Sequence, residues 1–159
     1  MATKKYRINY TLGDCFALPL REGGFARGVV ARMDGKGCVF GYLYGPRIDN
    51  AADLTVDPGW QAKHCLFSCM FGDLGLVTHE WTVLGLFPNW KPDDWPMPEF
   101  VRYNDDRSMA FVSKYDEKTF KCVREMKIPS SEACDPTLLP DGLWGYGAVE
   151  IRLTALLRM

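Results

Sequence analysis

Three short runs of strand-forming residues, separated by glycine-rich turns, follow one another near the start of the chain. The runs cover residues 13–20, 25–33 and 38–44, and the turns cover residues 22–24 and 34–37. Each turn carries two glycines, which supply the positive φ angles that tight hairpin turns need. Strands connected by turns this short pair with their sequence neighbours in antiparallel order. The segment therefore predicts an antiparallel meander.

Further strand-like segments follow a polar connection over residues 46–60, in which a short helix is expected near Asn50. Residues 61–71 are apolar and fit either a strand or a helix. The remaining strands are expected over residues 78–87, 100–103, 108–115 and 119–126. Strands therefore dominate most of the chain.

The last segment has the pattern of an amphipathic helix. Its apolar residues recur at helical spacing, at Val149, Leu153, Leu156 and Leu157, while Arg152 and Arg158 fall outside this stripe. The sum predicts an α+β fold: a curved antiparallel β-sheet, arranged as a barrel-like meander, with a C-terminal helix and few short helices. Because 159 residues is the size of one domain, we expect a single domain over residues 1–159.

The charge balance limits the kind of partner that the whole surface can attract. The chain has 19 Lys and Arg against 20 Asp and Glu, so its formal net charge is −1. Such a chain has no overall field to hold nucleic acid or an anionic membrane. No apolar stretch is long enough for a membrane helix, and no apolar signal segment follows the N-terminal lysines. We therefore expect a cytoplasmic protein without a membrane partner.

Six cysteines raise the question of disulfides, metal binding and thiol chemistry. They are Cys15, Cys38, Cys65, Cys69, Cys122 and Cys134. Their scatter, in a chain without a visible export signal, predicts free thiols packed as small apolar residues. The cluster with the most ligand-like composition comprises His64, Cys65, Cys69 and His79. Its spacing does not match the paired ligands of a zinc finger, so neither a metal nor another cofactor is expected.

A segment with four prolines, residues 88–98, predicts a rigid loop. It carries Trp90 and Trp95, which either close the open end of the sheet as core residues or contribute to a binding surface. Asp93 and Asp94 lie between the two tryptophans, and such a surface would suit a basic protein partner.

For two charged residues of the first two strands, the sequence predicts structural roles. Asp14 follows a glycine at the start of a strand, where an Asp side chain often accepts backbone N–H groups of a turn. Arg27 lies on the second strand and needs a carboxylate partner if it points inward. Asp14 is the partner that we expect for it.

Two sequence motifs resemble the immunity protein 26 family of bacterial polymorphic toxin systems. The first is Gly13-Asp14-Cys15-Phe16-Ala17-Leu18-Pro19-Leu20, followed by Phe25 and Gly28-Val29. The second is Trp81 with an apolar strand, then Pro88 and Pro98-Glu99-Phe100, with looser agreement at Tyr115 and Val149-Glu150. The resemblance spans about residues 6–157. It places the family's motif residues at Gly13, Asp14, Phe16, Pro19, Arg27, Gly28, Trp81 and Phe100.

The resemblance implies a cytoplasmic antitoxin that binds the C-terminal toxin domain of a cognate protein and blocks it by occlusion, without catalysis. The motif residues would then hold the fold, and toxin recognition would fall on loops. The residues expected to contact the toxin are Trp90, Asp93, Asp94 and Trp95, together with the acidic turn Asp105-Asp106.

Two other classes of protein stay open on the sequence alone. A small β-barrel that binds nucleic acid would use exposed aromatic and basic residues, namely Phe40, Tyr42, Tyr44, Arg32 and Lys36. The absence of net positive charge weighs against it. A thiol enzyme would use Cys65 or Cys69 with a histidine, although the spacing matches no thiol-enzyme motif.

Overall fold

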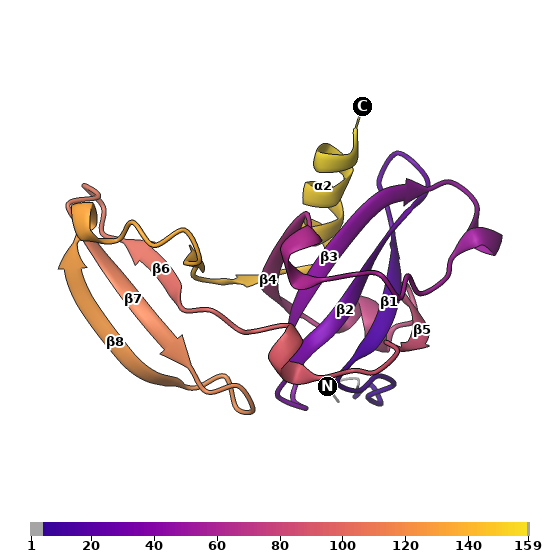
Figure 1. Ribbon diagram of the computed structural model, residues 1–159, viewed down its shortest axis with the longest axis horizontal. Helices are drawn as coiled ribbons and strands as arrows, with labels where there is room; N and C mark the ends of the chain where they lie inside the picture. Colours follow the sequence, from indigo (N-terminus) through magenta and orange to yellow (C-terminus); the bar gives the residue numbers. More distant parts are fainter. Residues whose placement is uncertain (1–4, 159) are drawn as a thin grey trace.

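The computed structural model describes residues 5–158, which form two β-sheets and a C-terminal helix (Figure 1). The six-stranded sheet has the order β10-β4-β3-β2-β1-β5. Its strands are β1 (Asp14–Pro19), β2 (Phe25–Met33), β3 (Cys38–Ile48), β4 (Phe67–Gly72), β5 (Thr82–Leu86) and β10 (Leu143–Trp144). The four-stranded sheet has the order β8-β7-β6-β9. Its strands are β6 (Phe100–Tyr103), β7 (Met109–Tyr115), β8 (Cys122–Pro129) and β9 (Leu139–Pro140).

The helices are short except for the last. The α-helices are α1 (Leu74–Val77) and α2 (Tyr146–Leu157), and the 3-10 turns are η1 (Ala51–Asp53), η2 (Ala62–His64), η3 (Pro92–Asp94) and η4 (Ser130–Glu132). The expected helix near Asn50 is thus one 3-10 turn, for which the Asn50 side chain accepts a hydrogen bond from the Ala52 backbone N–H. The α+β class and the C-terminal helix are confirmed.

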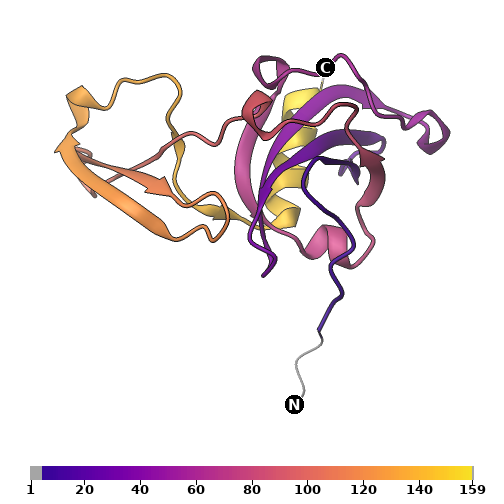
Figure 2. The same cartoon turned by 60° about the horizontal axis from the view of Figure 1, so that its bottom comes forward.

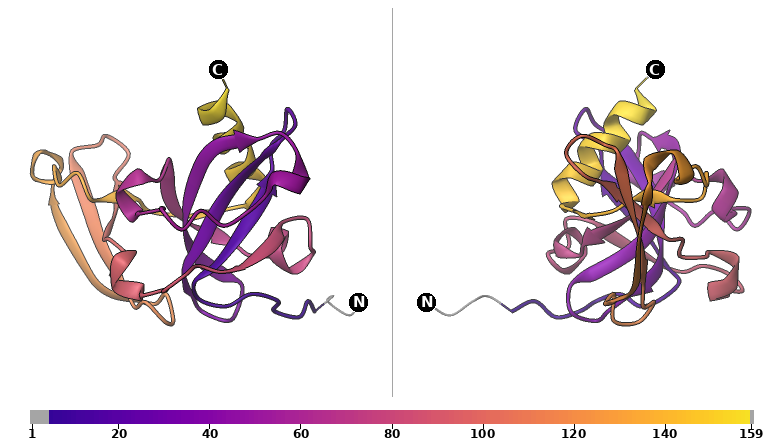
Figure 3. Two further views of the ribbon diagram at one scale, coloured as in Figure 1. Left: turned by 45° about the vertical axis from the view of Figure 1, so that its right-hand side comes forward. Right: turned by 90° about the vertical axis from the view of Figure 1, so that its left-hand side faces the viewer.

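The meander is confirmed, but the barrel is wrong. β1, β2 and β3 pair in antiparallel order, with Phe16 opposite Gly28 and Val29 opposite Tyr42. The edge strands β5 and β10 do not pair with each other, and neither sheet closes. The strands between residues 100 and 140 form their own sheet beside the first instead of completing a barrel, and the chain then returns to the large sheet as β10 (Figures 1 and 3). Each sheet also contains one parallel pair, β10 with β4 and β6 with β9.

Several strand boundaries differ from expectation. β3 continues to Ile48, four residues past the expected end at residue 44 and into the expected polar connection. The strand expected over residues 78–87 begins at Thr82, because α1 and a turn precede it and leave Trp81 just outside the strand. The ambiguous segment 61–71 becomes η2 followed by β4. The strand expected over residues 119–126 is shifted to Cys122–Pro129, because the turn that precedes it is longer than expected.

Both faces of the six-stranded sheet are buried, because side chains alternate between two faces along each strand. One core cluster includes Phe16, Phe71 and Trp81, and it is covered by Val149 and Leu153 of α2. Figure 2 shows α2 lying against this face of the sheet. The other cluster is formed by residues of β1 to β4, two loop tryptophans and Phe100 of β6, with members such as Cys15, Val29, Phe40, Tyr42, Tyr44, Trp60 and Trp95.

Candidate functional site

The proline-rich loop that links β5 to β6 is fixed by its own aromatic residues. The Trp90 and Trp95 rings stack with centroids 5.1 Å apart, and Phe87 meets Trp95 edge-on at 4.7 Å. Trp95 Nε1–H donates to the Tyr44 hydroxyl at 3.0 Å, and the residue is 2% exposed. Trp95 is therefore a core residue, as the first of the two sequence interpretations held, and it exposes almost no surface.

The Arg32 side chain holds the same loop by hydrogen bonds to the backbone of the loop. Its Nη1 donates to the carbonyl oxygen of Trp95 at 3.1 Å, and its Nη2 donates to that of Pro92 at 3.3 Å. The Tyr42 hydroxyl donates to the Pro96 carbonyl oxygen. Arg32 and Tyr42 lie on β2 and β3, so two strands of the large sheet fix the course of the loop.

Gly13 lets the loop approach β1 closely. It has a φ of +84°, and a Cβ atom there would lie 2.5 Å from Cγ of Trp90. That separation is far inside van der Waals contact, so only glycine allows the Trp90 ring to occupy this position. The backbone N–H of Phe87 also donates to the Gly13 carbonyl oxygen at 2.8 Å. Gly13 of the N-terminal motif thus contacts the loop directly and helps to hold it in position.

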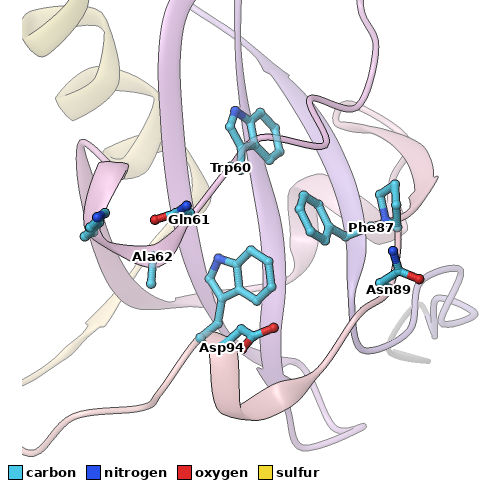
Figure 4. Close-up of a pocket in the computed structure, with 9 residues that line it drawn as sticks. Trp60, Gln61, Ala62, Phe87, Asn89 and Asp94 are labelled. Atoms are coloured by element: carbon cyan, nitrogen blue, oxygen red, sulfur yellow. The ribbon is translucent and has the colours of Figure 1, made fainter.

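An open pocket of about 510 Å³ lies between this loop and the segment around Trp60 (Figure 4). Its walls include the aromatic side chains of Trp60, Phe87 and Trp95. Most of the surface of each of these residues is buried in the core. Polar residues also line it, among them Asp94 and Lys63. An aromatic base with a few polar groups at the rim is typical of a site that accepts a protruding side chain of a partner.

The two acidic turns predicted as one binding set lie apart. Asp93 and Asp94 are exposed on η3, next to the pocket. Asp105 and Asp106 lie in the β6–β7 turn, at one end of β7. The β7–β8 turn, at the other end of β7, is the one that lies near the proline-rich loop (Figure 3). The Asp106 carboxylate accepts the N–H of Ser108 at 3.0 Å and its hydroxyl at 2.6 Å, and these bonds hold the pKa of Asp106 below its usual range.

The structure adds one acidic residue that the sequence did not single out. Glu117, in the β7–β8 turn, accepts a hydrogen bond from Arg32 Nη2 at 3.1 Å, beside the Pro92 carbonyl oxygen. Its side chain is about half exposed, so it adds a carboxylate, paired with Arg32, to the surface near η3. Arg32 and Glu117 are separated by 85 positions, and no local pattern signals their contact.

The predicted pairing of Arg27 with Asp14 is wrong. Asp14 instead accepts the backbone N–H of Thr11 at 2.9 Å, as expected for a turn residue, and its burial raises its pKa. Arg27 Nη1 donates to the Thr55 carbonyl oxygen at 2.9 Å, and the guanidinium lies 5.0 Å from the Trp60 ring centroid. The two residues face opposite sides of the sheet, because Arg27 lies opposite Ala17 and side chains alternate along β1.

The residues needed by the nucleic-acid alternative are not available for stacking. Phe40, Tyr42 and Tyr44 belong to the core, and Arg32 is buried beneath the proline loop. Nucleic-acid bases stack on exposed aromatic rings. Because these rings are buried, they cannot form the binding surface that the nucleic-acid alternative requires.

The thiol alternative also lacks its chemistry. Burial raises the pKa of Cys69 to about 12 and raises that of Cys65, whereas a nucleophilic cysteine needs a lowered pKa. All six cysteines are free, as predicted, although Cys122 and Cys134 are exposed rather than packed inside. Within residues 5–158, no group of three His, Cys, Asp or Glu side chains is arranged to hold a metal ion. No helix in the same range is long and apolar enough to cross a membrane.

The fold and the fixed loop define a small α+β protein whose candidate site is an aromatic pocket beside a loop held in place from the core. The chain belongs to the immunity protein 26 family, whose family model matches residues 11–111. Membership implies an immunity protein of a polymorphic toxin system, with a cognate toxin as its partner. No curated protein and no solved structure matches the chain.

The match is narrower than the span of residues 6–157 expected from the motifs. It runs from just before β1 into β7, and so includes the six motif positions that lie in β1, β2 and β6 as well as Gly13 and Trp81. Tyr115 and Val149-Glu150 lie outside it, so the match does not support their correspondence to the family.

Proposed function

We propose that this protein binds its cognate toxin through the loop between β5 and β6 and the adjoining pocket, and neutralises it by occlusion without catalysis. The observation that carries the proposal is the fixed backbone of the loop. Arg32 and Trp95 hold it from inside while Asp93 and Asp94 remain exposed beside an aromatic pocket. The proposal places the encounter in the cytoplasm of the protected cell.

A loop of this kind favours tight binding for physical reasons. Because its conformation is already fixed, little conformational entropy is lost when the partner binds. Buried aromatic walls can anchor one or two side chains of the partner, and such anchors supply most of the binding energy in protein interfaces. Exposed carboxylates increase the rate at which a basic partner finds the site. We therefore expect the toxin surface that meets this loop to be basic.

The proposal is tested by the double substitution Asp93→Asn and Asp94→Asn. At low salt, the association rate with the toxin domain should fall about tenfold, and the loss should shrink as salt screens the charges. The dissociation rate should change less. Stopped-flow or surface-based kinetics at two salt concentrations measures both rates, and a thermal melt confirms that the variant is folded.

The matched control is Asp105→Asn with Asp106→Asn, which changes the net charge equally at the second acidic turn. Asn at position 106 keeps an oxygen that can accept the Ser108 hydrogen bonds. The control should associate at the wild-type rate. If it is the control that slows association, the toxin binds at the β6–β7 turn, which is the second candidate surface, and the assignment to the proline loop is wrong.

A further inference from the structure

The four-stranded sheet ends in a long strand whose outer side pairs with no other strand of the described chain. β8 pairs with β7 on one side and forms the edge of the sheet on the other. Figure 1 shows this edge facing away from the rest of the molecule. All residues from Cys122 to Lys127 are exposed, with Val123 58% and Met126 45% exposed. An exposed edge of this length is a template for pairing with another strand.

The order of charges along β8 indicates which strand fits this edge. Two copies related by a twofold axis perpendicular to the sheet pair in antiparallel order and keep the same faces. The axis must then pass through a residue position, since each residue lies opposite one on the same face. An axis at Arg124, Glu125 or Lys127 places like charges opposite each other, and an axis at Val123 or Ile128 pairs only three residues of each strand. An axis at Met126 places Met126 opposite Met126 and each Glu125 opposite a Lys127.

The side chains that would meet across this axis are already oriented for it. Arg102 donates to both oxygens of Glu125, at 3.0 and 3.2 Å, and so fixes that carboxylate on one face of the sheet. Lys127 lies over the Phe111 ring on the same face, at 5.8 Å from its centroid. Opposite charges on one face and an apolar pair on the other both stabilise cross-strand pairing.

We propose that two copies of this protein associate through their β8 strands, paired in antiparallel order about Met126. The two four-stranded sheets then form one continuous sheet, with residues 123–129 of each strand in register. Because so short a strand pair buries little surface, the dimer forms reversibly and depends on protein concentration. The toxin is not required for this association.

Cross-linking tests the register directly, in a background that carries Cys122→Ser and Cys134→Ser to remove the exposed thiols. Directly opposed residues have Cβ atoms close enough for a disulfide, so Met126→Cys should yield a covalent dimer under mild oxidation. The matched control is Arg124→Cys, because the two copies of that residue lie four positions apart along the strand pair. We expect the Met126→Cys variant to cross-link at least tenfold faster. Equal rates, or faster cross-linking of the control, overturn the proposal.

Sedimentation of the wild-type chain and two charge variants tests the association without a cross-link. Lys127→Glu places like charges opposite each other twice, and should raise the dissociation constant of the dimer at least tenfold. Adding Glu125→Lys restores opposite charges across the strand pair and should recover part of the affinity, because the new lysine also lies beside Arg102. A wild-type chain that stays monomeric at all concentrations overturns the proposal. Since no toxin is present, neither result bears on the proposed function.

Discussion

At the scale of single residues, the N-terminal motif supports the structure through backbone geometry. Gly13 adopts a positive φ and leaves room for the Trp90 ring, while Asp14 closes the turn before β1 by accepting the Thr11 N–H. Phe16 stacks on Trp81 with ring centroids 5.4 Å apart, and a Cβ atom at Gly28 would lie 2.6 Å from the Phe16 ring. These residues therefore hold the fold on which the candidate binding loop rests.

For Asp14 we predict an effect on stability that depends on pH. Asp14→Ala loses the hydrogen bond to the Thr11 N–H, and should lower the free energy of unfolding by about 1 kcal/mol. Asp14→Asn keeps an acceptor oxygen but carries no charge. Because burial raises the pKa of Asp14 in the folded state, ionisation becomes a cost as pH rises. The stability of the wild type relative to Asp14→Asn should therefore decline from about pH 3 to pH 7.

Thermal melts of the three proteins across this pH range measure both effects. If Asp14→Ala melts at the wild-type temperature and loses toxin binding instead, Asp14 belongs to the binding surface and not to the fold.

At the scale of elements, α2 completes a core that the family match includes only in part. Val149 and Leu153 are buried against the sheet, and the Glu150 carboxylate accepts the Trp81 Nε1–H at 2.8 Å. Arg21 Nε donates to the other oxygen of Glu150 at 3.2 Å. α2 lies outside residues 11–111, so a residue within the match depends on one beyond it for its hydrogen bond.

Trp81→Phe should lower the free energy of unfolding by about 1–3 kcal/mol, because it leaves one oxygen of a buried carboxylate without its donor. Adding Glu150→Met removes the carboxylate, and should recover part of the loss. Denaturant unfolding of the wild type, both single variants and the double variant measures the coupling. Strictly additive losses would contradict the predicted interaction.

At the scale of the whole molecule, the two sheets are joined through Phe100. Its ring meets Phe40 of the large sheet at 6.0 Å and Tyr115 of the small sheet at 5.5 Å between centroids. The Arg32–Glu117 ion pair spans the same junction. We propose that these contacts make residues 1–159 a single cooperative domain.

The wild-type chain should accordingly unfold in one transition, whereas Phe100→Ala should lose about 3–5 kcal/mol and separate the two sheets. The five tryptophans all lie outside the four-stranded sheet, so fluorescence follows the large sheet and its loops, while far-UV circular dichroism follows both sheets. The two signals should coincide for the wild type and diverge for Phe100→Ala. Divergence already in the wild type would show two separate units.

The meander and the helix could be predicted because their signals are local. The glycine pairs at residues 22–24 and 34–37 fix hairpin turns, and the turns fix the pairing of β1 to β3. The stripe of Val149 and Leu153 predicts the buried face of α2 in the same way. The prolines predict a rigid loop, but Arg32, which fixes its backbone, enters the sequence analysis only through the nucleic-acid alternative.

Local sequence signals are sufficient for the short-range elements of this protein, namely its hairpin turns, its proline-rich loop and its amphipathic helix. Contacts between distant segments place β6 to β9 in a separate sheet, turn Arg27 away from Asp14, and bring Glu117 to the surface near η3. The two groups of features differ in the sequence separation of the residues that form them. A turn or a helix depends on neighbours a few positions away, whereas sheet partners and buried charges depend on contacts between residues tens of positions apart.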